Sequence, residues 1–173
     1  REGGDNTPLN SGKGSVYEGG IHTPALVRWP GRMGAGVGLA QPIAVQDLYP
    51  TLVAAAGATM PVKLKIDGTN QLNAWLSGKV QPREPFAVSV SDTALIDGDW
   101  KLIKFSDGKK ALYNLKDDLS ERNNLVTKHA DVVARLSVKM EELTKGLPEV
   151  EVPKAGPGSG GGASGGPRAR PSR

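Results

Sequence analysis

Two Asp-Gly dipeptides constrain the second half of this chain more than any other feature. Asp97-Gly98 and Asp107-Gly108 separate short apolar runs at 86–90, 100–105 and 111–115, and the first run could extend to Ile96. An Asp-Gly pair between apolar runs is a strong local signal for a β-hairpin. The sequence therefore predicts an antiparallel meander.

A helix is predicted after the meander, from about Lys128 to Lys145, because apolar residues recur there at helical spacing. Gly146 and Pro148 follow as typical helix stops. The predicted apolar stripe consists of Val132, Leu136, Met140 and Leu143. Packed on one face of the sheet, this helix would complete a small α+β layer.

The first half of the chain predicts two further elements. After a glycine-rich loop, the apolar run 25–29 stops at Pro30-Gly31, which is typical of a short buried strand. The stretch 45–57 predicts an amphipathic helix with Leu48, Leu52 and Ala55 or Ala56 on its buried side. Pro50 lies early in this helix, and Gly57 ends it.

These elements divide the chain into four parts. Residues 1–62 form the first, 63–85 a polar connecting segment, 86–150 the sheet with its helix, and 151–173 a tail. From residue 155 onward no aliphatic side chain is larger than alanine, so the tail cannot bury enough apolar surface to offset its ordering entropy. The tail is expected to be disordered.

Charge and composition exclude several classes of function. The net charge is +4, and four basic residues without any acid lie from Lys154 onward, so residues 1–153 are neutral overall. A neutral body with only 5% aromatic residues argues against nucleic-acid binding. The absence of cysteine excludes disulfides, thiolate catalysis and Cys-ligated zinc, and leaves the localisation open. No apolar run approaches the ~20 residues of a membrane helix.

A glycine-lined loop with a central lysine lies at 10–24. Lys13 stands between Gly12 and Gly14, where backbone N–H groups could approach an anion and the ammonium could neutralise it. A solvated surface lysine in a loop that needs glycine only for its turns explains the same pattern equally well. The spacing alone leaves both interpretations open.

The same segment closely resembles the GKGSxYEGGxRxP signature of the formylglycine-dependent (type I, arylsulfatase-like) sulfatases, of the alkaline-phosphatase-like superfamily. Pro8-Leu9 resembles the family's lead-in to this signature. Further C-terminal landmarks of the family follow in the same order, so that the resemblance covers residues 6 to 145. They are 27–31, 47–52, 67–68, 98–102, 112–115 and 121–125.

The resemblance implies a fold and a function. The complete protein would have the α/β alkaline-phosphatase-like fold, with 1–62 ending the catalytic domain and 86–150 forming the C-terminal subdomain. Lys13 would be a catalytic residue that binds the sulfate group of a sulfated small molecule or sugar. The formylglycine precursor in C/S-x-P-x-R and the calcium ligands would lie upstream, in the N-terminal part of the same sulfatase. These residues alone would then be inactive, and the family favours a location outside the cytoplasm.

Several residues resemble parts of the family's active site that this sequence otherwise lacks. His22 stands where the family has arginine and could bind substrate, although a packed polar histidine is the simpler interpretation. Asp5-Asn6 resembles a calcium-binding pair but stands too close to Lys13. We therefore expect these two side chains to form hydrogen bonds with backbone groups of a turn. The segment 169–173 fits x-x-P-x-R but has Ala169 at the nucleophile position. Ile96 stands near where the family tends to have another arginine.

The remaining polar and aromatic residues have structural interpretations. Asp117-Asp118 and Glu121-Arg122 are expected to form a solvated turn. The aromatic residues of the apolar runs are expected to pack in the core and on the sheet. They are Trp29, Tyr49, Trp100 and Tyr113.

Two alternatives to a sulfatase remain. A phosphatase or phosphodiesterase of the same superfamily would share the fold. A noncatalytic interaction module would need neither the nucleophile nor the metal.

Overall fold

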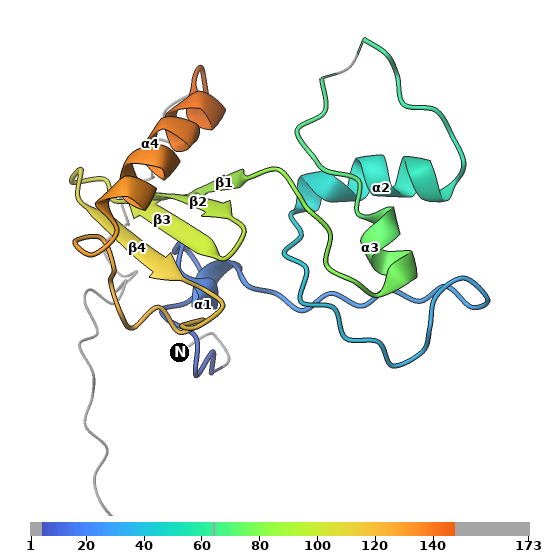
Figure 1. Cartoon of the computed structure of the whole chain (residues 1–173), viewed down its shortest axis with the longest axis horizontal. Helices are drawn as coiled ribbons and strands as arrows, with labels where there is room; N and C mark the ends of the chain where they lie inside the picture. The colour runs from blue at the N-terminus through green and yellow to red at the C-terminus, as the bar shows by residue number, and fades with distance from the viewer. Residues whose placement is uncertain (1–4, 64, 148–173) are drawn as a thin grey trace, which may run out of the picture.

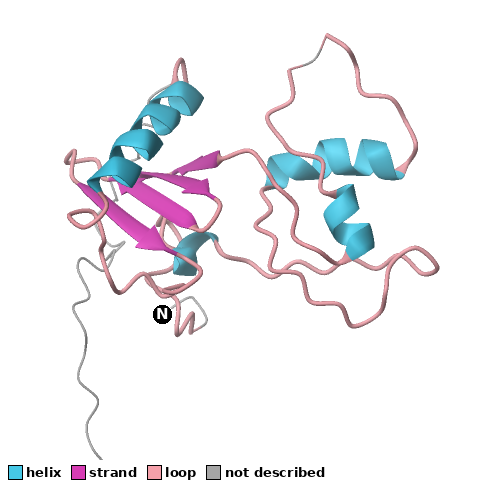
Figure 2. Ribbon diagram, viewed as in Figure 1, coloured by secondary structure: helices cyan, strands magenta, loops and turns pink. Residues whose placement is uncertain are grey.

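A computed structural model describes residues 5–63 and 65–147 of the chain. Within this part, a four-stranded sheet with one long helix lies apart from a second group of two short helices (Figure 1). Extended loops occupy most of the chain between these two groups (Figure 2). No helix in the described ranges is long and apolar enough to cross a membrane. The predicted disordered tail lies outside the described residues.

The sheet is an antiparallel meander in the order β1-β2-β3-β4, as predicted. The strands are β1 (Phe86–Ser89), β2 (Thr93–Asp97), β3 (Trp100–Lys104) and β4 (Lys110–Asn114). Both Asp-Gly pairs lie at the hairpin connections, where Asp97 ends β2 and Gly98 and Gly108 take φ 58° and 83°. The first apolar run splits into two strands, because the chain turns between Val90 and Asp92, whose N–H and C=O bond at 2.9 Å.

The helix α4 (Ala130–Thr144) covers one face of the sheet (Figure 1). Leu136 and Met140 are buried against the central strands, with Val132 and Val133 beside them. The strand residues of this core are Leu95, Leu102 and Leu112. Leu143 was predicted to face the sheet, but it is 39% exposed, because the last turn of α4 extends past the sheet (Figure 1).

The opposite face of the sheet is covered by the segment that contains the Lys13 loop. Val16 is buried and Tyr17 half-buried there, ahead of the short helix α1 (Glu18–Ile21). They pack on the strand residues Ala94, Ile103, Ala111 and Tyr113. The sheet therefore lies between α4 and the N-terminal glycine-rich segment.

The second group consists of a 3-10 turn η1 (Val45–Asp47), α2 (Leu48–Ala55) and α3 (Leu72–Ser77). The predicted helix at 45–57 is present and ends before Gly57, at φ 68°. Its predicted buried side is wrong, since Leu48 and Leu52 are 39% and 58% exposed. The buried side of α2 is instead the one that carries Thr51.

The buried strand predicted at residues 25–29 is also wrong. This run is extended but pairs with no strand in the described part of the chain, and Leu26 is 96% exposed. The helix α3 was not predicted, because the stretch 63–85 that contains it is polar and punctuated by glycine. The division of the complete protein at residues 62/63 and 85/86 stays a prediction.

Candidate functional site

Lys13 lies at the tip of a turn on the surface. The turn is closed by a hydrogen bond from the Ser15 N–H to the Gly12 carbonyl at 3.2 Å, and Gly14 takes φ 88°. The Lys13 side chain is exposed and has no hydrogen bond or ion pair to any described residue. An ammonium in this position can accept an anion without first losing a protein partner.

The backbone of this turn rests directly on Gly19 and Gly20. A Cβ on Gly19 would lie 2.3 Å from the Asn10 carbonyl oxygen, and one on Gly20 would lie 2.3 Å from that of Ser15. The Gly19 N–H donates to the Asn10 carbonyl at 2.8 Å. Only glycine permits this approach. Residues 10–15, which we call the lysine loop, and the helix α1 therefore form one closely packed unit.

The residue just before these glycines is held by a buried cluster of charges. Lys101 on β3 is fully buried, and its Nζ lies 2.8 Å from Glu18 Oε1 and 2.8 Å from Glu121 Oε1. The Glu18 N–H also donates to Glu121 Oε2 at 2.6 Å. We call Glu18, Lys101 and Glu121 the buried ion cluster.

The charges of the buried ion cluster do not balance, since two carboxylates face one ammonium. Burial raises the pKa of Glu121, while Lys101 and the Glu18 N–H oppose the rise. Glu121 was predicted to lie in a solvated turn, but it is only 3% exposed and has φ 53°. The sequence around Lys101 does indicate this cluster. Side chains alternate along β3, so Lys101 lies on the same buried face as Ile103, and a buried ammonium needs an acidic partner.

His22 is connected to the same cluster. Its Nδ1 lies 2.7 Å from Glu18 Oε2, and its side chain is 46% exposed. Because a carboxylate only accepts, Nδ1 carries the hydrogen and Nε2 is the nitrogen left for a further partner. The simpler interpretation of His22 as a packed polar residue is therefore incomplete.

The residues that imitate calcium ligands bond the local backbone instead. Asp5 Oδ1 accepts from the Thr7 N–H at 2.9 Å, and Asn6 Nδ2 donates to the Gly19 carbonyl at 2.8 Å. Among the described residues there is no group of three or more His, Cys, Asp or Glu side chains that could hold a metal. These residues do not fit a calcium site, and we derive no step through a metal.

The aromatic predictions hold only for the sheet. Trp100 and Tyr113 pack in the two cores, and burial raises the pKa of Tyr113. Tyr49 is 46% exposed, so its predicted place in a core is wrong. Trp29 is half-buried and lines a surface pocket described below.

A second buried ion pair organises the other group of helices. Arg83 Nη1 lies 2.7 Å from Asp47 Oδ2, and the two side chains are 7% and 1% exposed. Asp47 also accepts from the N–H groups of Ala44 and Thr69, both at 2.8 Å. Burial lowers the pKa of Arg83, and Asp47 opposes this shift. This pair ties α2 to the segment that leads into β1.

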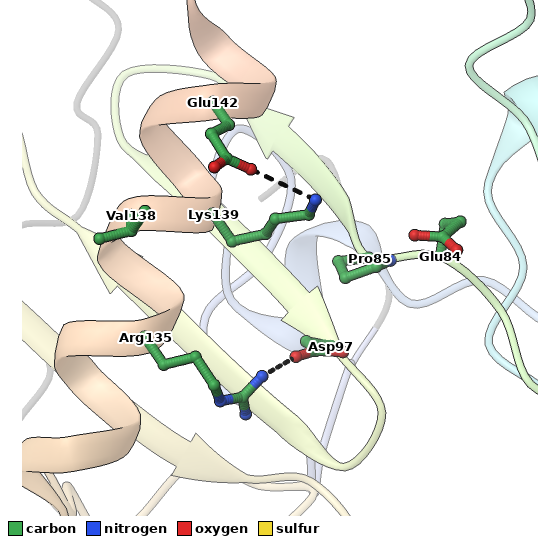
Figure 3. A pocket seen from close by; sticks show the side chains of 7 residues that line it. All are labelled: Glu84, Pro85, Asp97, Arg135, Val138, Lys139 and Glu142. Carbon is green, nitrogen blue, oxygen red and sulfur yellow. Dashed lines mark hydrogen bonds and ion pairs between the residues drawn. The ribbon is translucent and has the colours of Figure 1, made fainter.

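Two surface pockets differ in chemistry from the Lys13 loop. The first lies between α4 and the start of the sheet, and its cations are already paired, Arg135 with Asp97 and Lys139 with Glu142 (Figure 3). The second is mainly apolar. Its walls are Val27, Arg28, Trp29, Met33, Leu52, Ala55 and Trp75.

Comparison with known proteins finds sulfatases among the relatives of this chain. No family model matches the sequence. An N-acetylgalactosamine-6-sulfatase from Homo sapiens is 41% identical over 85 residues, which are 49% of this chain and 16% of that protein. A steryl-sulfatase from Mus musculus is 40% identical over 84 residues, which are 49% of this chain and 13% of that protein. The chain thus spans a small part of the length of these relatives.

Solved structures extend the similarity over more of the chain. The crystal structure of Ps i-CgsB matches with a TM-score of 0.74 at 31% identity, over 82% of this chain and 33% of that one. A structure from work on glycosaminoglycan metabolism by Bacteroides thetaiotaomicron matches with a TM-score of 0.70 at 27% identity, over 78% and 32% of the two chains. The structural neighbours include sulfatases, and the chain is similar to a C-terminal part of a sulfatase.

Proposed function

We propose, from the premise that this chain is a sulfatase-like segment, that the complete protein hydrolyses sulfate esters and that Lys13 binds the transferred sulfate group. The observation that carries this proposal is the exposed Lys13 ammonium on a loop whose backbone is fixed by Gly19 and Gly20. Its relatives named above are sulfatases, which favours sulfate over the phosphatase or phosphodiesterase alternative.

The chemical role of Lys13 is electrostatic. Cleavage of a sulfate ester moves negative charge onto the sulfuryl oxygens and the leaving oxygen, and a preorganised cation stabilises that charge. Lys13 has no protein anion to release among the described residues, so its ammonium can approach the non-bridging oxygens directly. His22, whose Nδ1–H is held by Glu18, could accept a hydrogen bond at Nε2 from a hydroxyl group of the substrate.

The remaining chemistry needs groups that this chain does not supply. The family's formylglycine arises from a cysteine or serine motif, and the chain contains no cysteine. We propose that the nucleophile and the calcium ligands come from an N-terminal part of the same protein. These 173 residues on their own should therefore bind an anion without turning over a sulfate ester.

An exposed apolar surface around α2 supports such a partner. Val27 and Leu52 are 48% and 58% exposed, and both line the apolar pocket that also contains Trp29. Contiguous apolar surface of this kind is typical of an interface. Here it would lie against the rest of the catalytic domain, which would also account for the lack of a strand partner for residues 25–29 within the described part of the chain.

We propose a sulfated carbohydrate as the substrate class. Ps i-CgsB was crystallised in complex with k-i-k-neocarrahexaose, and the matching structure from Bacteroides thetaiotaomicron comes from work on glycosaminoglycans. The alternative is a smaller sulfate ester such as a steryl sulfate, since another relative is a steryl-sulfatase. Comparing a sulfated sugar with a steryl sulfate as substrates would separate the two.

The proposed function is tested in the complete protein with two substrates, a sulfate and a phosphate ester, and with two lysine variants. An aryl sulfate should be hydrolysed in preference to the matching aryl phosphate. Lys13→Ala should lower kcat/KM for the sulfate by about 100-fold or more, the cost of one transition-state donor. The control is Lys79→Ala, another exposed loop lysine, which should leave the rate unchanged. Faster hydrolysis of the phosphate, or an unaffected Lys13→Ala enzyme, would refute the proposal.

A further inference from the structure

The lysine loop and the sheet come from distant parts of the sequence, and the buried ion cluster joins them. Glu18 follows the lysine loop by only a few residues, whereas Lys101 lies on β3 and Glu121 lies beyond β4. The Glu18 side chain binds Lys101, and the Glu18 backbone N–H binds Glu121. Glu18 is thus held at two points, by β3 and by the segment after β4.

A short and closely packed path leads from this cluster to Lys13. Glu18 is followed directly by Gly19 and Gly20, which contact the backbone of residues 10–15 with no space for a side chain. The Asn6 side chain adds a bond to the Gly19 carbonyl at 2.8 Å. Any displacement of Glu18 must therefore move the turn that carries Lys13.

Stability alone is a poor explanation for such a cluster. Burying three charges carries a large desolvation cost, and apolar residues of the same volume often give equal or greater stability. The cluster also contains one more carboxylate than ammonium. What the two hydrogen bonds of Glu18, at 2.6 Å to Glu121 and 2.8 Å to Lys101, do provide is a defined position for Glu18.

We propose that the buried ion cluster positions Lys13 for sulfate binding, so that Lys101 and Glu121 are positioning residues for the active site although neither touches substrate. The proposal rests on the proposed role of Lys13. It gives the C-terminal part of the chain a role in catalysis, since β3 and the segment after β4 supply two of the three charges that fix the sulfate-binding loop.

The test is a double-mutant cycle between Lys101 and Lys13 in the complete protein, read as kcat/KM for an aryl sulfate. Lys101→Met should lower kcat/KM by about 10- to 100-fold, as expected when a catalytic group is misplaced by about 1 Å. The control is Lys104→Met, an exposed lysine on the same strand, which should have no effect. In the Lys13→Ala background, Lys101→Met should cause no further loss.

Each other outcome contradicts the proposal. A Lys101→Met enzyme as active as Lys104→Met would mean that the cluster does not act on the site. An equal loss in both backgrounds would mean that Lys101 only supports the fold. If Lys101→Met does not fold, the same cycle is run with Glu121→Gln, which keeps the pair between Lys101 and Glu18. Failure of the proposed function is separate, because it shows as an unaffected Lys13→Ala single variant.

Discussion

The Nζ of Lys101 lies 2.8 Å from Oε1 of Glu18, although 83 residues separate them in the sequence. This contact connects the lysine loop to the C-terminal sheet, and Glu121 completes it from the segment after β4.

The core between α4 and the sheet depends on Leu136, which is fully buried. Replacing Leu136 by Ala should reduce the free energy of unfolding by about 2 to 5 kcal/mol, the range for a large-to-small change in a core. The control is Leu143→Ala on the same helix, where the side chain is 39% exposed and a smaller change is expected. Denaturant unfolding of both variants measures the difference, and equal losses would contradict the packing described.

The close approach of Gly19 to the lysine loop should make this position intolerant of any side chain. Gly19→Ala would place a Cβ 2.3 Å from the Asn10 carbonyl oxygen, so the loop must shift. We expect a loss of about 1 to 3 kcal/mol in unfolding free energy, as for other overpacked positions. The control is Gly38→Ala, at a glycine whose added Cβ would meet nothing within 4 Å. Equal melting temperatures for the two variants would disprove the close contact.

The pair of Asp47 and Arg83 should be essential for the group around α2. Arg83→Leu leaves the Asp47 carboxylate buried without its cation, which should cost about 3 to 5 kcal/mol. Arg135→Leu removes a cation from an exposed pair with Asp97 and should cost about 1 kcal/mol or less. Thermal unfolding distinguishes these outcomes, and a harmless Arg83→Leu would show that the pair is dispensable.

The pH dependence of stability should report on Glu121. Its pKa in the folded protein is raised above the ordinary value of 4.5, mainly by burial. The folded state therefore holds this proton more tightly, so the contribution of Glu121 is present below pH 4.5 and is lost as pH rises through the raised pKa. Compared with Glu121→Gln, the wild type should lose melting temperature as pH increases from about 4 to about 7. A difference that is constant or changes in the opposite direction would contradict the assignment.

The sequence predicted those elements whose signals are local. The Asp-Gly turns and the apolar spacing in 128–145 depend on neighbouring residues, and both elements are present. The buried sides of residues 25–29 and of α2 were predicted wrongly. An apolar run indicates that a surface can be buried, but it does not indicate whether the partner lies in the same part of the chain.

The candidate site was predictable only in part, for a related reason. Lys13 is recognised from the glycines around it, because a turn with φ 88° at Gly14 is a local requirement. The buried ion cluster depends on three distant segments, and Glu121 follows a polar stretch that is typical of a surface turn. Only Lys101, a charged residue inside an apolar strand, signalled that buried acids had to face it.

The measurement that tests the central claim most directly is a calorimetric titration of the complete protein with inorganic sulfate. If Lys13 binds the sulfate group, Lys13→Ala should weaken sulfate binding by roughly 10- to 100-fold, the range for one hydrogen bond to a charged group. The Lys79→Ala control should retain the wild-type affinity, since this lysine is exposed in a different loop. An unchanged dissociation constant in Lys13→Ala would contradict the account.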